Sequence, residues 1–235
     1  MSGFIHSPIN SQRLHGRLVF LSASRPVLER GAAYFEGVDP LLIANAAQKA
    51  AETVFGASGG ILFGGHPTIT PLVLSVVRDY VRKTSTGDSR RVQLFQSELF
   101  RGSEPEEVRT LLEEGFAEVH WIKATGDRKE SLTAMRREML KAGPVACILI
   151  GGMEGVYAPG SDLSEFEMFR TMWKGRPVYP IAAAGGASRI LWEAMRDGKE
   201  EVSWEYRVIS PEDLVRPEFS FLMSRIVDDI IVHLE

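Results

Sequence analysis

The sequence predicts an α/β protein with a Rossmann-like, doubly wound, mostly parallel sheet of about six or seven strands and helices on both faces. Six short apolar segments alternate with longer segments of helical period along the chain. Such alternation favours right-handed crossover connections and hence a parallel sheet. In addition, the segments "VFLSA" and "CILIGG" are apolar almost without interruption, which is typical of strands covered on both faces.

The strands are expected where β-branched residues cluster between chain breakers. They lie at 17–23, 59–65, 91–97, 118–124, 145–152 and 177–183. The last segment contains Pro177 and Pro180. Because proline cannot donate a ladder hydrogen bond, we expect this strand near an edge of the sheet.

Helices are expected between these strands and after the last one. Asp39 and Thr70 precede prolines and are expected to be N-caps, whereas Ser103 and Glu106 fit a capping box. The helices are predicted at 40–54, 71–83, 128–141, 162–173, 186–196 and 217–235, and a further helix runs from the capping box at Ser103 to about residue 114. C-cap glycines are expected at Gly115, Gly143 and Gly175. The last helix carries an apolar stripe from Phe219 to Leu234, which packs on the sheet or forms a subunit contact.

Composition excludes several classes of protein. The 235 residues are 44% hydrophobic and 25% charged, as in a globular protein with a sizeable core, and we expect an irregular lead (1–16) and a single domain (17–235). A secretory signal and a membrane span are both lacking, so we expect a cytoplasmic protein without membrane contact. The net charge of −4 argues against a long nucleic-acid partner. Cys147 is the single cysteine, and the histidines show no ligand spacing, so we expect no disulfide, metal or cofactor.

Glycine pairs follow three of the predicted strands, at the edge where parallel sheets bind ligands. Standard dinucleotide, P-loop and α/β-hydrolase motifs do not occur in the sequence. Glycine allows close approach of the backbone, and helix amino ends attract anions, so this edge is predicted to bind an anionic ligand. Tight turns and a solvated Arg25 are the alternative interpretation. The candidate ligand-binding residues are Ser22, Ser24, Arg25, Gly64, Gly65, His66, Thr68, Gly151, Gly152, Met153, Glu154, Gly155, Gly185, Gly186 and Ser188.

The segments "FLSASRP", "ILFGGHPTITPLV", "ILIGGMEGV" and "YPIAAAGGAS" resemble the SLOG superfamily. These Rossmann-like domains are related to the LOG phosphoribohydrolases and to the DNA-processing protein DprA, and the closest resemblance is to subgroups of prokaryotic conflict and anti-phage systems. The resemblance covers roughly residues 17–196. It implies a pocket for a nucleotide-derived ligand such as ADP-ribose, cyclic ADP-ribose or NAD, with an effector or TIR-type enzyme as a possible partner in trans.

The resemblance implies less about catalysis. LOG enzymes have a Gly-Gly-x-Gly-Thr loop with a catalytic glutamate three residues beyond, but here Val156 follows Gly155, and Glu165 and Glu167 come after an insertion. We therefore favour a binding or sensing module in which Glu154 accepts ribose hydroxyls. A LOG-type N-glycosidase acting through Glu154, Glu165 or Glu167 is one alternative, and a structural subunit with empty loops is another. Common dimerisation of relatives and the apolar stripe predict a homodimer or larger symmetric oligomer.

Overall fold

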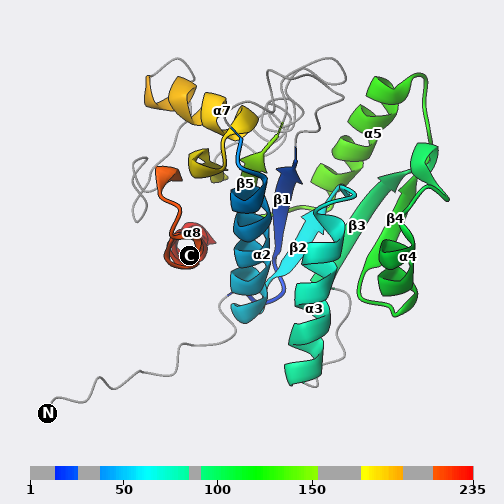
Figure 1. Cartoon of the computed structure of the whole chain (residues 1–235), viewed down its shortest axis with the longest axis horizontal. Coiled ribbons are helices and arrows are strands. Elements are labelled where there is room, and N and C mark those ends of the chain that lie inside the picture. Colours follow the sequence, from blue (N-terminus) through cyan, green and yellow to red (C-terminus); the bar gives the residue numbers. More distant parts are fainter. Residues whose placement is uncertain (1–13, 26–37, 85–90, 153–175, 198–213, 235) are drawn as a thin grey trace, which may run out of the picture.

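The computed structural model describes residues 14–25, 38–84, 91–152, 176–197 and 214–234. These residues form one sheet of six strands in the order β4-β3-β2-β1-β5-β6, and every neighbouring pair is parallel (Figure 1). The strands are β1 (Leu18–Ser24), β2 (Gly60–Phe63), β3 (Val92–Ser97), β4 (Glu118–Ile122), β5 (Ala146–Gly151) and β6 (Val178–Ile181). The predicted fold class is confirmed, and the proline-containing strand β6 lies at an edge of the described sheet.

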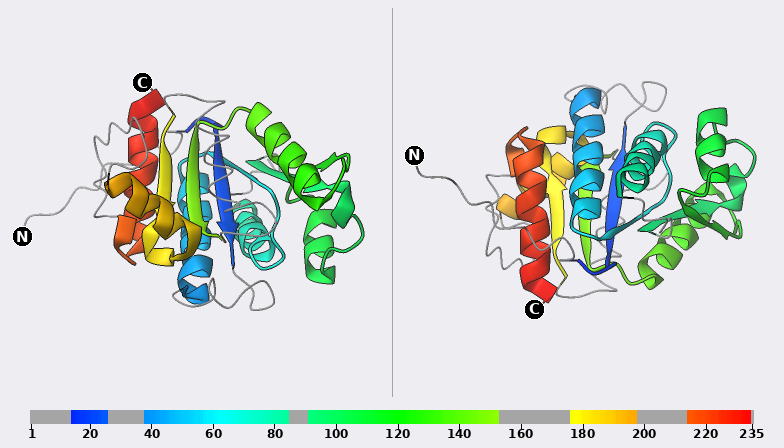
Figure 2. Two further views of the ribbon diagram at one scale, coloured as in Figure 1. Left: turned by 90° about the horizontal axis from the view of Figure 1, so that it is seen from above. Right: turned by 90° about the horizontal axis from the view of Figure 1, so that it is seen from below.

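Helices cover both faces of the sheet (Figure 2). The helices are α2 (Pro40–Gly56), α3 (Thr70–Thr84), α4 (Glu106–Glu113), α5 (Arg128–Lys141), α7 (Gly186–Arg196) and α8 (Phe219–Leu234), with short 3-10 helices η3 (Glu98–Phe100) and η4 (Ala182–Ala184). One buried cluster joins one face of the sheet to α2, α3 and α8, and a second joins the other face to α5 and α7. The predicted helix at 162–173 and Gly175 lie outside the described residues.

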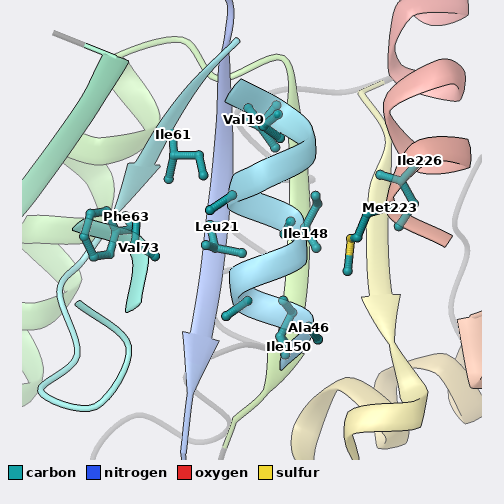
Figure 3. Close-up of a cluster of buried hydrophobic side chains, with 14 of the residues drawn as sticks. Val19, Leu21, Ala46, Ile61, Phe63, Val73, Ile148, Ile150, Met223 and Ile226 are labelled. Carbon is teal, nitrogen blue, oxygen red and sulfur yellow. The ribbon is translucent and has the colours of Figure 1, made fainter. Parts of the chain in front are cut away.

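The larger core lies between the sheet and α2 (Figure 3). Val19, Leu21, Ile148 and Ile150 project from β1 and β5 toward α2, whose buried face includes the small residue Ala46. A small residue at this position lets the helix axis approach the central strands closely, and the branched side chains of the strands fill the remaining space.

The apolar stripe of α8 is buried within the chain. Phe219, Met223 and Ile226 are at most 2% exposed, and α8 packs beside α2 (Figure 3). Of the two expected roles for this stripe, the structure therefore supports packing inside the protomer. Leu234 at the end of α8 is the exception, with 41% of its surface exposed.

Of three predicted helix caps, one is confirmed and two are corrected. Asp39 caps α2 as predicted, accepting hydrogen bonds from the amides of Leu41 and Leu42. The predicted Ser103–Glu106 capping box is wrong, because the Ser103 hydroxyl donates to the carbonyl of Phe100 in the turn after η3, and Pro105 is the N-cap of α4. Thr70 is the first residue of α3 instead of its cap. A capping box does form at Asp127 and Glu130, before α5.

Leu14, which belongs to the predicted irregular lead (1–16), packs against the core. Leu14 is fully buried, and its amide donates to the carbonyl of Ala57 after α2. A β-carbon at Gly59 would lie 2.5 Å from the Leu14 side chain. Leu14 therefore fills the base of the core beneath β2.

Candidate functional site

The strand order determines which of the predicted loops can share a ligand. The chain moves outward from β1 through β2 and β3 to β4, and α5 then carries it back to β5 on the other side of β1 (Figure 1). The direction of winding thus reverses between β1 and β5, and open α/β sheets bind ligands at such a switch point.

The four strands whose carboxyl ends carry the predicted ligand residues are consecutive neighbours, in the order β2-β1-β5-β6. With strands about 4.8 Å apart, the four strand ends span about 14 Å. The loops that begin at Gly64 and Gly185 therefore flank the strand ends at Ser24 and Gly151, which are paired in register. Met153, Glu154, Gly155, Glu165 and Glu167 lie outside the described residues.

Hydrogen bonds join the ends of β1 and β5 to the first turn of α7. The amide of Gly152 donates to the carbonyl of Ser24 at 3.1 Å, and the amide of Ala187 donates to the carbonyl of Gly152 at 3.2 Å. The fully buried hydroxyl of Ser188 donates to the carbonyl of Gly151 at 3.0 Å. The first turn of α7 is therefore held directly beside the switch point.

Two of the predicted glycines make this close packing possible. Gly151 has φ +68°, and a β-carbon there would lie 2.7 Å from the carbonyl oxygen of Ser24 and from the side chain of Ile43. Gly186 has φ +64°, and its β-carbon would lie 2.5 Å from the carbonyl oxygen of Gly152. Both positions need glycine for the contacts between the loops as well as for their left-handed backbone.

Among the described helices that start at this edge, α2 and α5 have their amino ends occupied by carboxylates of the chain itself. Asp39 accepts from two amides of α2, and Asp127 accepts from the Glu130 amide of α5. A negative side chain at this position already satisfies the free amides and the positive end of the helix dipole. Neither helix start is therefore open to an anionic ligand.

The β2–α3 loop satisfies several of its amides by hydrogen bonds within the loop. The amides of Ile69 and Thr70 both donate to the carbonyl of His66, and the Thr68 amide donates to the Nδ1 atom of the same histidine at 3.4 Å. Pro67 and Pro71 have no amide hydrogen. The glycines, prolines and histidine of this loop thus form a turn that caps itself.

Helices α4 and α7 both start without a side-chain cap, but α4 follows β3, away from the switch point, whereas α7 starts beside it. The N-cap of α7 is Gly185, with φ +73°, and no side chain of the described residues hydrogen-bonds to its first turn. Within the same described part of the chain, the Ala187 amide is bonded to the Gly152 carbonyl, whereas the amides of Gly186 and Ser188 have no partner. The start of α7 is therefore the amino end at the switch point that can still receive an anion.

The end of β1 contributes polar groups to the same place. Ser22 is largely buried and Arg25 is exposed. The hydroxyl oxygen of Ser24 is buried and has no hydrogen-bond partner among the described residues. A buried hydroxyl without a partner is unfavourable unless a ligand or water satisfies it, so Ser24 is the candidate of the β1 loop with the clearest chemical reason to contact a ligand.

The described residues also give two wider findings. Within 14–25, 38–84, 91–152, 176–197 and 214–234, no three His, Cys, Asp or Glu side chains gather closely enough to hold a metal ion. No helix in this part of the chain has the length and apolar character needed to cross a membrane.

One residue that the sequence analysis missed is Gln96, near the end of β3, whose side chain contacts Gly65. The available signal was a glutamine near the carboxyl end of a predicted strand, at the edge where ligands bind.

A comparison with curated proteins found no match. A family model described as the SLOG cluster3 family matches residues 33–210 of the chain. The match includes the glycine loops after β2, β5 and β6, whereas β1 with Ser22 and Ser24 precedes it. This family indicates a nucleotide-related function on a Rossmann-like fold. Because the match spans most of the 235 residues, the chain belongs to the SLOG cluster3 family.

Proposed function

We propose that the carboxyl edge at β1, β5 and α7 binds a nucleotide-derived ligand of the ADP-ribose, cyclic ADP-ribose or NAD type. In this proposal the protein is a cytoplasmic binding or sensing module of a prokaryotic defence or signalling system. The observation that carries the proposal is the uncapped first turn of α7, held beside the switch point by Ser188 and the Gly152 carbonyl.

The ligand's phosphate would lie at the start of α7. The amides of Gly186 and Ser188 can donate to phosphate oxygens there, and the positive end of the helix dipole favours negative charge. Ser24 can donate its hydroxyl hydrogen to a phosphate oxygen or exchange hydrogen bonds with a ribose hydroxyl. Arg25 can pair with a second phosphate, and Glu154, two positions after Gly152 in the chain, is proposed to accept hydrogen bonds from ribose hydroxyls.

The phosphate position can be tested with two exposed arginines on the same helix. Arg189 lies in the first turn of α7 and Arg196 is its last residue, and their side chains are 53% and 50% exposed. Arg189→Glu places a negative charge beside the proposed phosphate, whereas Arg196→Glu makes the same change about 10 Å further along the axis. We expect Arg189→Glu to weaken binding of ADP-ribose several-fold, with a smaller effect at high salt.

A thermal-shift panel of ADP-ribose, cyclic ADP-ribose, NAD and AMP would first identify ligands, since a ligand that binds the native state raises the stability of the protein. Titration calorimetry would then measure the affinities of the parent protein and of both variants. Equal effects of the two arginine substitutions would contradict the proposed phosphate position. Failure of every nucleotide to bind the parent protein would contradict the function itself.

The same ligands separate sensing from the alternative LOG-type N-glycosidase activity. A sensor holds its ligand unchanged, so chromatography of incubated samples should recover intact nucleotide. Sustained release of adenine or nicotinamide would instead favour the glycosidase, and replacement of Glu154, Glu165 or Glu167 should then lower the rate on the order of 10²–10⁴-fold.

We further propose that the protein acts as a homodimer or larger symmetric oligomer, with an effector or TIR-type enzyme as a partner in trans. Since the apolar stripe of α8 is used inside the protomer, this assembly would use other surface residues. Phe221 on the outer side of α8, 62% exposed, is the described apolar side chain of this helix best placed for such a contact.

A further inference from the structure

Gln96 lies against the β2–α3 loop from the neighbouring strand. It is the penultimate residue of β3, which pairs with β2. A β-carbon at Gly65 would overlap the carboxamide nitrogen of Gln96, and would lie 3.0 Å from its Cδ atom and 2.8 Å from the side chain of Leu94. Position 65 must therefore be glycine for the Gln96 carboxamide to lie where it does.

The surroundings of Gln96 are firmly packed. On the opposite face of β3, the ring of Phe95 stacks on His120 with centroids 4.5 Å apart. The next residue, Ser97, is fully buried, and its hydroxyl accepts a hydrogen bond from the Leu99 amide. Because residues on both sides are fixed by these contacts, the backbone that carries Gln96 is held in place at the carboxyl edge of the sheet.

Gln96 is half-buried, and its carboxamide makes no hydrogen bond to any residue that the structure describes. A primary amide offers two N–H donors and an acceptor oxygen in one plane. A half-buried amide that is packed on a glycine and has an unused donor and acceptor is suited to recognise a group with a complementary donor and acceptor side by side.

We infer that Gln96 reads the adenine base of the ligand. Adenine presents its 6-amino donor next to the ring-nitrogen acceptor N7, and glutamine side chains pair with this edge through two hydrogen bonds, whereas hypoxanthine has two acceptors there. The inference rests on the proposed function and extends it by naming the residue that selects the base of the ligand.

The position of Gln96 agrees with a base contact. The end of β3 is two strands from β1 and three from β5, which corresponds to about 10 Å and 14 Å along the edge. Gln96 therefore lies away from the phosphate position at α7, at the other end of an extended ligand. Gly65 has a role in this arrangement that differs from anion binding, since it makes room for the side chain that contacts the base.

The test compares ADP-ribose with its hypoxanthine counterpart, in which an oxygen acceptor replaces the 6-amino donor of adenine. Calorimetry is carried out on the full chain and on Gln96→Leu, which keeps a similar volume but removes both hydrogen bonds. Gln93→Leu is the matched control, because Gln93 is a part-exposed glutamine of the same strand that lies about 10 Å before Gln96.

We expect the parent protein to prefer the adenine ligand by about tenfold or more, and Gln96→Leu to weaken ADP-ribose binding roughly 10- to 100-fold and to abolish the preference. Gln96→Glu, which can accept from the amino group but cannot donate to the ring nitrogen, should also bind ADP-ribose less tightly than the parent. Gln93→Leu should retain both the affinity and the preference. The thermal midpoint of each variant without ligand shows whether the fold is retained.

Three results would overturn the inference in distinguishable ways. If Gln96→Leu keeps the parent's affinity and preference while Arg189→Glu weakens binding, Gln96 does not read the base although the proposed phosphate position holds. If neither ADP-ribose nor its hypoxanthine counterpart binds the parent protein, the inference fails together with the proposed nucleotide ligand. Stronger dependence on Gln96 for nicotinamide mononucleotide than for ADP-ribose would assign the residue to a carboxamide and would likewise overturn the adenine assignment.

Discussion

Removal of the Ser188 hydroxyl should affect both the stability of the protein and the geometry of its ligand site. The hydroxyl is fully buried and donates to the carbonyl of Gly151 at 3.0 Å, so it joins the first turn of α7 to the end of β5. In Ser188→Ala this bond is lost, and the carbonyl oxygen of Gly151 loses its hydroxyl donor. Ser188 therefore acts as a positioning residue for the α7 amides, even if its side chain never contacts the ligand.

The expected magnitude follows from the burial of both groups. A typical hydrogen bond contributes about 1 kcal/mol net, and a buried acceptor left without its partner costs about 1–3 kcal/mol. We therefore expect Ser188→Ala to lower the free energy of unfolding by about 2 kcal/mol. For a chain of this size that corresponds to a decrease in Tm of about 4–8 °C. Affinity for ADP-ribose should fall roughly tenfold, or about 1.4 kcal/mol, because the first turn of α7 is less firmly held.

Ser131→Ala provides the control. Ser131 is also fully buried, and its hydroxyl donates to the carbonyl of Thr125 at 2.7 Å and accepts from the Thr125 amide at 2.9 Å, in the loop after β4. Urea unfolding would measure the stability of both variants, and calorimetry would measure their affinity for ADP-ribose, so that an effect on one quantity can be told from an effect on the other. We expect both to lose stability and only Ser188→Ala to lose affinity. Equal loss of affinity in the two variants, or no change in Ser188→Ala, would refute the positioning role.

Three further predictions concern other parts of the molecule. Asp39→Ala removes the N-cap of α2 and should lower the free energy of unfolding by about 1 kcal/mol in urea titrations; an unchanged midpoint would contradict the capping contribution. Tyr179→Phe removes the 2.7 Å hydrogen bond to the buried carboxylate of Asp229 and should cost about 1.5–3 kcal/mol, whereas a cost below that of Asp39→Ala would show that water replaces the hydroxyl. In the proposed homodimer, Phe221→Ser should shift the protein toward monomer in light scattering at micromolar concentration, and an unchanged mass would exclude the outer side of α8 as the contact.

Local sequence signals predicted some elements closely. The bounds of α5 (Arg128–Lys141) and α7 (Gly186–Arg196) agree with those predicted, because the glycines near their ends break the helical pattern. The cap of α4 was mispredicted for a local reason as well. Ser103 can bond to a helix amide or to the preceding 3-10 turn, and the geometry after Phe100 favours the turn. Competing short-range hydrogen bonds of this kind are equally compatible with the sequence.

The glycine loops were recognisable as a group, but their individual roles were not. The pairs at Gly64, Gly151 and Gly185 share one composition, yet the first belongs to a self-capped turn and the other two hold the open start of α7 against the sheet. The sequence predicted an anion contact for all three pairs. It could not distinguish them, because the hydrogen bonds in which the loops differ depend on the folded geometry of each loop.

The sequence by itself determined the alternation of strands and helices, the parallel sheet and the edge of the sheet that carries the glycine loops. These features follow from hydrophobic period and chain breakers, which act over a few residues. Tertiary structure alone decided the strand order β4-β3-β2-β1-β5-β6, the contact between Ser188 and Gly151, and the approach of Gln96 to Gly65. The Ser188–Gly151 and Gln96–Gly65 contacts join residues 37 and 31 positions apart. They exist because α7 packs against β5 and β3 pairs with β2.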